Sequence, residues 1–114
     1  MAKFLVLYLA PTAVVDEWMK TPAEQRKVEE EKMMNEWKKW TSEHATKFAD
    51  HGAGVGKPKR IDANGITDTR NDIMLYAIVN ADSPDAAAAI FRGHPHLQIP
   101  QSSIEVMPLK SLEM

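Results

Sequence analysis

The sequence predicts an α+β fold, a ferredoxin-like plait with a four-stranded antiparallel sheet and its helices on one face. The order of patterns supports it: strand, short helix, long helix, strand, possible edge hairpin, strand, helix, strand. The two best strand patterns, residues 3–9 and 73–79, are apolar almost throughout. They leave few polar positions for a sheet face exposed to water, so we expect a homodimer that pairs through sheet faces.

Length and composition restrict the class of protein. A chain of 114 residues predicts a single domain, residues 1–114, and 44% hydrophobic with 26% charged residues is ordinary for a folded one. The net charge of −2 argues against a nucleic-acid partner, which needs a clustered basic surface. With no cysteine, disulfides and thiolate metal sites are excluded, and a reducing, cytoplasmic location is expected. No apolar run approaches the roughly 18 residues of a membrane span.

The first pattern, residues 3–9, has two interpretations. A single lysine followed by a short apolar run resembles a minimal signal peptide. The same residues, rich in Phe, Val and Tyr and stopped by Pro11, are typical of a buried strand, which we favour.

Two helices are expected next. Residues 12–20 predict a short helix that carries Trp18. Thr21-Pro22-Ala23-Glu24 predicts the start of a long helix, with the Thr21 hydroxyl and the Glu24 carboxylate capping first-turn amides. That helix is expected to run to about Asp50 and to be closed by Gly52. One stripe at helical spacing forms its buried face: Met33, Trp37, Trp40, His44 and Phe48.

The second half of the chain alternates strands and turns. Gly54 and Gly56 predict a bent or bulged strand, and their spacing fits neither a P-loop nor a dinucleotide motif. Asn64-Gly65 predicts a hairpin turn between residues 57–61 and 66–70. Residues 73–79 predict a central strand, and Ser83-Pro84 starts a helix over residues 85–92 that Gly93 ends. A closing strand around Ile104 and Val106 follows.

Candidate site residues cluster around a His-Pro-His turn. His94 and His96 straddle Pro95, and we expect His96 to face a cavity while His94 faces solvent or the dimer partner. Alternatively, His96 only holds the turn by bonding a backbone carbonyl. His44 is either an acid, base or ligand facing the cavity, or a half-buried histidine with a backbone or water partner. The expected walls of the cavity are tryptophans: Trp18, Trp37 and Trp40. No metal or cofactor is expected, because two histidines in one turn supply too few ligands.

Several stretches carry a family resemblance: the strand from Lys3 to Leu9, the glycine after the long helix, the Pro95-His96-Leu97 turn, and above all Ile104-Glu-Val-Met-Pro108. The last resembles the closing "IEVRP" strand of the YCII-related, or DGPF-like, family of the dimeric α/β-barrel superfamily. The resemblance implies a ferredoxin-like fold, a homodimer whose sheets face each other, and a small cavity between sheet and helices.

One branch of that family has an acid/base dyad, a histidine on the long helix and an Asp-Pro pair before the last strand. Here His94-Pro95 stands in place of Asp-Pro, and the helix histidine would fall near Trp40 or Thr41 instead of His44. Met107 also replaces the arginine of the closing strand, which removes a potential anion contact.

Three functions are compatible with these residues. The first is a cofactor-independent enzyme, a lyase, isomerase or monooxygenase acting on an organic acid or aromatic compound, with His94, His96 or His44 moving protons. The second is a non-catalytic module that binds a small organic or aromatic ligand in the same cavity. The third is a structural homodimer whose histidines only complete turns. The residues alone leave open whether the protein is an enzyme.

Overall fold

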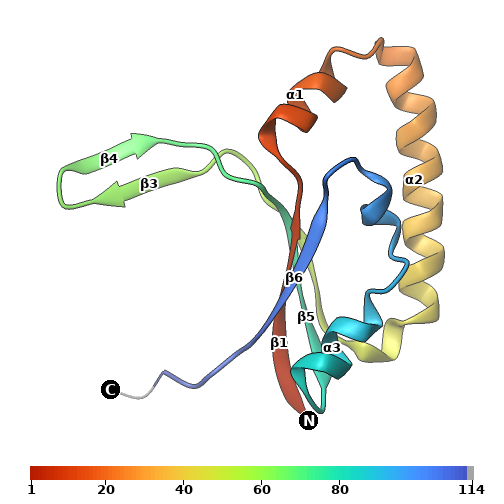
Figure 1. The fold of residues 1–114 in the computed structure, drawn as a ribbon, viewed down its shortest axis with the longest axis vertical. Helices are drawn as coiled ribbons and strands as arrows, with labels where there is room; N and C mark the ends of the chain where they lie inside the picture. Colours follow the sequence, from red (N-terminus) through yellow and green to blue (C-terminus); the bar gives the residue numbers. More distant parts are fainter. Residues whose placement is uncertain (113–114) are drawn as a thin grey trace.

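The computed structural model describes residues 1–112, so the last two positions of the expected domain 1–114 lie outside the described residues. The chain is α+β, with a four-stranded antiparallel sheet and three α-helices (Figure 1). In chain order the elements are β1 (Ala2–Leu9), α1 (Thr12–Met19), α2 (Ala23–Glu43), β2 (Phe48–Gly54), β3 (Lys59–Asp62), β4 (Gly65–Asp68), β5 (Ile73–Ala81), α3 (Pro84–Ile90) and β6 (Ser103–Pro108). Two short 3₁₀ helices span Ala45–Lys47 and Pro95–Gln98.

The sheet has the strand order β2-β5-β1-β6, with every neighbouring pair antiparallel. This order is compatible with a ferredoxin-like plait, and the predicted α+β class with its four-stranded sheet is confirmed. Strand β1 lies inside the sheet, between β5 and β6. Its side chains alternate between two faces, as the pleat of a strand requires.

One face of β1 forms the centre of the core. Phe4, Val6 and Tyr8 are at most 3% exposed. Across the strand pairs they meet residues such as Ala77 and Val79, and α2 and α3 contribute Trp40 and Ala87 to the same cluster. The intervening Leu5, Leu7 and Leu9 belong to the opposite face and are partly exposed. Residues 73–79 thus form a central strand as predicted, but within one chain only one face of the sheet is covered by helices.

The long helix is shorter than its periodicity predicts. Helix α2 ends at Glu43 instead of about Asp50, and Phe48–Gly54 form strand β2. The side chain of Phe48 still reaches the core, where its ring meets that of Trp40 with centroids 5.8 Å apart. As a strand, this segment forms backbone hydrogen bonds with β5, which it could not form as a helix. These tertiary hydrogen bonds override the local helical pattern.

Gly52 has a different role from the predicted one. It does not close the helix but lies within β2 at φ +73°, where the register between β2 and β5 shifts. A β-carbon at this position would lie 1.7 Å from the carbonyl oxygen of Tyr76. The close approach of two backbones, together with a left-handed conformation, therefore requires glycine.

The two predicted helix caps have opposite outcomes. The predicted cap of α2 is wrong: Pro22 is the N-cap residue and no side chain caps the helix. Arg26 Nε instead donates to the Thr21 carbonyl oxygen at 3.1 Å, which engages the backbone of Thr21 and not its hydroxyl. The predicted cap of α3 is confirmed, since Ser83 Oγ accepts a hydrogen bond from the Ala86 amide at 3.1 Å.

The predicted hairpin is confirmed as β3 and β4, but not as an edge of the main sheet. The two strands form a separate two-stranded sheet that extends from the body on the side away from α2 (Figure 1). Its turn contains Ala63 and Asn64, and Asp62 Oδ1 accepts from the Asn64 amide at 2.8 Å. Within residues 1–112, no helix combines the length and the apolar character that crossing a bilayer requires.

The backbone requirement at Gly52 gives a first prediction. Gly52→Ala should lower the free energy of unfolding by about 2–5 kcal/mol, because left-handed strain adds to the clash with the Tyr76 carbonyl. Urea unfolding followed by tryptophan fluorescence measures the change. Gly56→Ala is the matched control, since a β-carbon there meets no atom within 4 Å and should change stability by less than about 1 kcal/mol. Equal stability of the two variants would contradict the assignment.

Candidate functional site

The His-Pro-His turn is built from its own side chains. Gly93, at φ +70°, turns the chain after α3, and His94 is extended at φ −60° and ψ 139°. Pro95 then begins a 3₁₀ helix, and His94 Nδ1 accepts the amide hydrogen of His96 at 2.9 Å. The imidazole thus caps this short helix as a serine or asparagine would. The backbone conformation and the ring orientation of His94 are coupled by this bond.

Both histidines of the turn are buried, His94 at 1% and His96 at 0% exposure. The prediction that His94 faces solvent or a partner is therefore wrong. Its ring lies against Trp37 and Trp40 of α2, with centroid distances of 4.4 and 4.3 Å. The capping bond explains the difference, because it turns the ring back over the core instead of letting it follow the extended backbone outward.

His96 is fixed to the sheet. Its Nε2 lies 2.9 Å from the carbonyl oxygen of Leu9, at the end of β1, 87 residues away in sequence. The hydroxyl of Ser102 donates to the His96 carbonyl oxygen at 2.9 Å and holds the backbone of the turn from the other side. The observation agrees with the structural interpretation of His96, in which the ring bonds a backbone carbonyl and holds the turn.

These bonds assign the protons of the two rings. His94 Nδ1 accepts, so in the neutral ring the proton lies on Nε2; His96 Nε2 donates to a carbonyl, so its Nδ1 carries a lone pair. The two remaining atoms, His94 Nε2 and His96 Nδ1, are buried and have no hydrogen-bond partner among the described residues. One donor and one acceptor are thus left at the centre of the aromatic cluster, each at a cost of about 1–3 kcal/mol.

Burial keeps both histidines uncharged. It lowers the pKa of His94 from 6.5 to about 4, and the neighbouring His96 and His44 act in the same direction. Burial also lowers the pKa of His96, although the hydrogen bond to the Leu9 carbonyl oxygen opposes the change. At neutral pH both rings are neutral, so they can donate or accept hydrogen bonds, but they are weak bases and lack the second proton that an imidazolium would give as an acid.

His44 contacts the same cluster from the end of α2. Its ring stacks on Trp40 with centroids 4.1 Å apart, and its Nδ1 lies 2.7 Å from the Trp40 carbonyl oxygen. The side chain satisfies a carbonyl of the last helical turn, which is the expected role of a half-buried histidine at a helix end. The structure therefore brings His44, His94, His96, Trp37 and Trp40 together. It does not bring Trp18 there: the aromatic contacts of residues 1–112 do not include this side chain of α1.

A cavity of about 440 Å³ lies next to the cluster, between α2 and the strands β1, β2 and β5. Its walls include Tyr8, Trp37, Thr41, Phe48, His51 and Tyr76. Trp37 is the one predicted site residue among them. Trp40 and the histidine pair lie behind this wall, with the ring centroid of His94 5.2 Å from that of Tyr8. A larger hollow of about 580 Å³ lies at the base of the β3–β4 hairpin, where none of the predicted site residues lines it.

Sequence reasoning missed several residues of this cavity. Tyr8 continues the alternation of Phe4 and Val6, which predicts that it faces inward. The alternation does not predict that its ring lies between the cavity and the histidines. Burial raises the pKa of its hydroxyl, so the phenol stays protonated. His51 stacks on Phe48 with centroids 4.8 Å apart, and both are placed at the cavity only because the segment is a strand instead of a helix.

No protein-family model matches this chain, and no curated protein matches it either. The resemblance to the YCII-related family therefore stays a prediction. Within residues 1–112, no three histidine, cysteine or carboxylate side chains gather into a group that could hold a metal ion.

The lowered pKa of the buried His94 gives a second prediction. Between pH 6.5 and about pH 4 the unfolded chain binds a proton at His94 that the folded chain does not bind, so acid favours unfolding. The free energy of unfolding should fall by about 3 kcal/mol from this residue as the pH is lowered from 7 to 4, with a further contribution of the same sign from His96. Urea unfolding at several pH values measures it.

His94→Asn is the matched variant, because the Asn side-chain oxygen can replace Nδ1 as the acceptor for the His96 amide but does not titrate. The variant should be less stable at pH 7 and show a shallower pH dependence. Wild-type stability that is unchanged between pH 7 and pH 5 would contradict the neutral, buried state of the pair.

Proposed function

We propose that this protein binds a small aromatic compound in the cavity between α2 and the sheet, in keeping with the resemblance to the YCII-related family. The observation that carries the proposal is the aromatic lining of this cavity by Tyr8, Trp37 and Phe48. Its volume of about 440 Å³ lies in the range of sites for small ligands. Three rings on three different elements present flat surfaces against which a planar ligand can stack.

A few polar groups accompany the aromatic rings. Thr41 and His51 line the same cavity and can orient a ligand through hydrogen bonds. A mostly apolar wall with a small number of polar groups is the usual composition of a small-molecule site. The matching ligand is therefore an aromatic ring with one or two polar substituents.

The histidine pair supports binding more than catalysis. His94 and His96 are neutral, and both lie behind the wall that Tyr8 and Trp37 form. A general base works best with a pKa near the working pH, and the lowered values here make weak bases. Acid/base catalysis by these residues would need Tyr8 or Trp37 to move aside so that the lone pair of His96 Nδ1 meets the ligand. The enzyme hypothesis, in which His94, His96 or His44 moves protons, stays a prediction, and the unpaired Nδ1 of His96 is the one acceptor that this pair leaves for it.

We also propose that two copies pair through their open sheet faces, forming a dimeric α/β barrel. The face opposite the helices carries partly exposed apolar side chains on three strands: Leu5, Leu7, Leu9, Tyr76, Ile78 and Met107. The exposed area supports this assembly. A compact monomer of this mass exposes about 6,300 Å², whereas the chain exposes 8349 Å². The excess of about 2,000 Å² per chain lies in the range that obligate homodimers bury.

The ligand proposal gives a third prediction. Small aromatic compounds such as indole, phenol and benzoate should quench tryptophan fluorescence and raise the melting temperature, because Trp37 lines the cavity and binding stabilises the folded state. Thr41→Phe on α2 places a larger side chain at the cavity wall and should weaken binding at least tenfold. The control is Lys39→Phe on the same helix, at an exposed position outside the residues that line the cavity. A panel in which no compound changes either signal would count against the site.

The dimer proposal gives a fourth prediction. Light scattering at micromolar concentration should report twice the chain mass of 12.8 kDa. Leu7→Glu should give a monomer, because Leu7 pairs with both Tyr76 and Glu105 at the middle of the open face and a second carboxylate would be buried there. Val28→Glu, on the exposed surface of α2, should leave the mass unchanged. A wild-type protein that runs as a monomer would remove the proposal.

A further inference from the structure

The β3–β4 hairpin is a ribbon without a core of its own. All eight residues of its two strands are exposed. A two-stranded ribbon alone is marginally stable in water and usually needs a surface to pack on. Yet the ribbon is continuous with the main sheet, since the Val55 amide donates to Met74 and the Thr69 amide to Pro58 along its base. It is an extension of the β2–β5 pair into solvent.

One face of this ribbon is suited to contact another protein. Ile61 and Ile66 are directly paired across the strands and are 76% and 70% exposed. Two residues away on the same face, Lys59 forms an ion pair with Asp68, its own cross-strand partner. The face thus combines an exposed apolar pair with charges that neutralise each other. Such a surface is suited to packing against another protein and lacks the net positive charge that would bind a polyanion.

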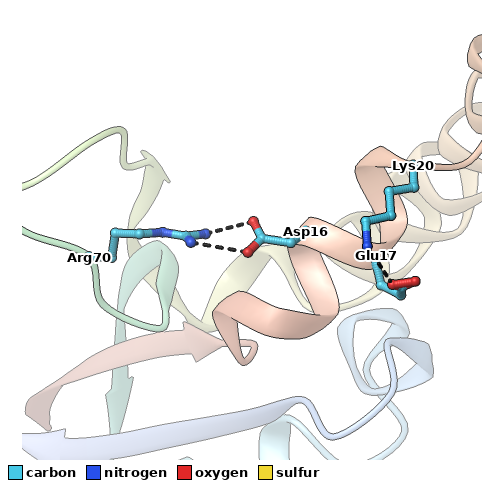
Figure 2. A network of polar contacts seen from close by, with 4 residues as sticks. All are labelled: Asp16, Glu17, Lys20 and Arg70. Atoms are coloured by element: carbon cyan, nitrogen blue, oxygen red, sulfur yellow. Dashed lines mark hydrogen bonds and ion pairs between the residues drawn. The ribbon is translucent and has the colours of Figure 1, made fainter.

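A second ion pair lies at the base of the ribbon. Arg70 binds Asp16 of α1 with both terminal guanidinium nitrogens, Nη2 to Oδ1 at 2.8 Å and Nη1 to Oδ2 at 3.1 Å (Figure 2). The pair joins residues 54 positions apart, and its bidentate geometry fixes orientation. Hydrogen bonding from Arg70 also lowers the pKa of Asp16, so the contact persists across the neutral range. The base of the hairpin is therefore tied to the body of the domain.

The tied ribbon points to the side of the sheet that the helices leave open (Figure 1). This is the side on which the proposed homodimer places its second copy. The radius of gyration of 16.1 Å exceeds the value of about 13 Å for a compact chain of this length, as a projecting segment requires.

We infer that the hairpin is an arm that grips a second copy of this chain, with Ile61 and Ile66 packed against the flank of the copy that covers the open sheet face. The inference rests on the proposed homodimer and extends it, because it gives the arm a part in the assembly that sheet pairing does not require. The second copy fits better than a foreign partner for two reasons: the arm and the apolar sheet face lie on one side of the molecule, and the excess exposed area matches what an obligate homodimer buries.

The test is the dissociation constant of the dimer, measured by analytical ultracentrifugation. Replacing both isoleucines, Ile61→Ser with Ile66→Ser, should raise this constant at least tenfold. Val28→Ser is the matched control, since Val28 is 67% exposed on α2 and should leave it unchanged. Asp16→Asn, which loosens the arm at its base, should raise the constant about threefold. Lys20→Gln, which breaks the neighbouring Glu17–Lys20 pair in Figure 2 without touching the arm, should not.

A second measurement keeps the test independent of these variants. The chain has no cysteine, so Asn64→Cys gives one attachment point, at the tip of the arm, for a photoreactive benzophenone. Irradiation should yield a covalent dimer, with the cross-link joining the tip to the other chain. A wild-type monomer would overturn the homodimer and the arm together. A wild-type dimer whose constant is unaffected by the isoleucine changes, and whose tip links only to its own chain, would overturn the arm alone.

Discussion

The core, the open sheet face and the His-Pro-His turn all depend on strand β1. It lies inside the sheet, bonded to β5 and β6, so its backbone is satisfied on both sides and its side chains must find two separate environments. The face with Phe4, Val6 and Tyr8 forms the core with the helices. The face with Leu5, Leu7 and Leu9 is not covered by any helix of residues 1–112. The carbonyl oxygen of Leu9, at its end, holds His96 and with it the turn before the last strand.

The aromatic cluster follows from that arrangement. Once His96 is anchored to Leu9 and its amide is bonded to His94, the second imidazole is directed between Trp37 and Trp40. Burial of two polar rings is tolerated because each makes one hydrogen bond and both remain neutral. Tyr8 belongs both to this cluster and to the adjacent cavity. A ligand that contacts Tyr8 or Trp37 would therefore be separated from the histidine pair by one side chain.

The open sheet face and the hairpin have a common physical origin. Both are surfaces that the chain builds from hydrogen-bonded backbone but does not cover with its own side chains. Covering the face would need a further layer of structure, and 114 residues provide helices for one side only. The proposed second copy would supply that layer without additional sequence, and symmetric pairing would then account for both surfaces.

Much of the fold follows from local signals in the sequence. The alternation along β1, the Ser83 cap of α3 and the turn at Asn64 each depend on a few neighbouring residues, and each is present in the structure. These signals predict the order of strands and helices along the chain, and few topologies accommodate that order. Of the candidate site, the sequence identified the tryptophan stripe and the paired histidines, which do meet.

Contacts between distant segments decided the rest. Phe48–Gly54 form a strand instead of the predicted helix because they pair with β5. As a strand, this segment places Phe48 and His51 at the cavity. Both imidazoles of the turn are buried because a carbonyl 87 residues away binds one and the tryptophans of α2 enclose the other. The base of the hairpin meets α1 through the ion pair of Arg70 with Asp16, 54 residues away in the sequence. Periodicity along the chain carries no information on such partners, since each exists only after the separate elements have packed.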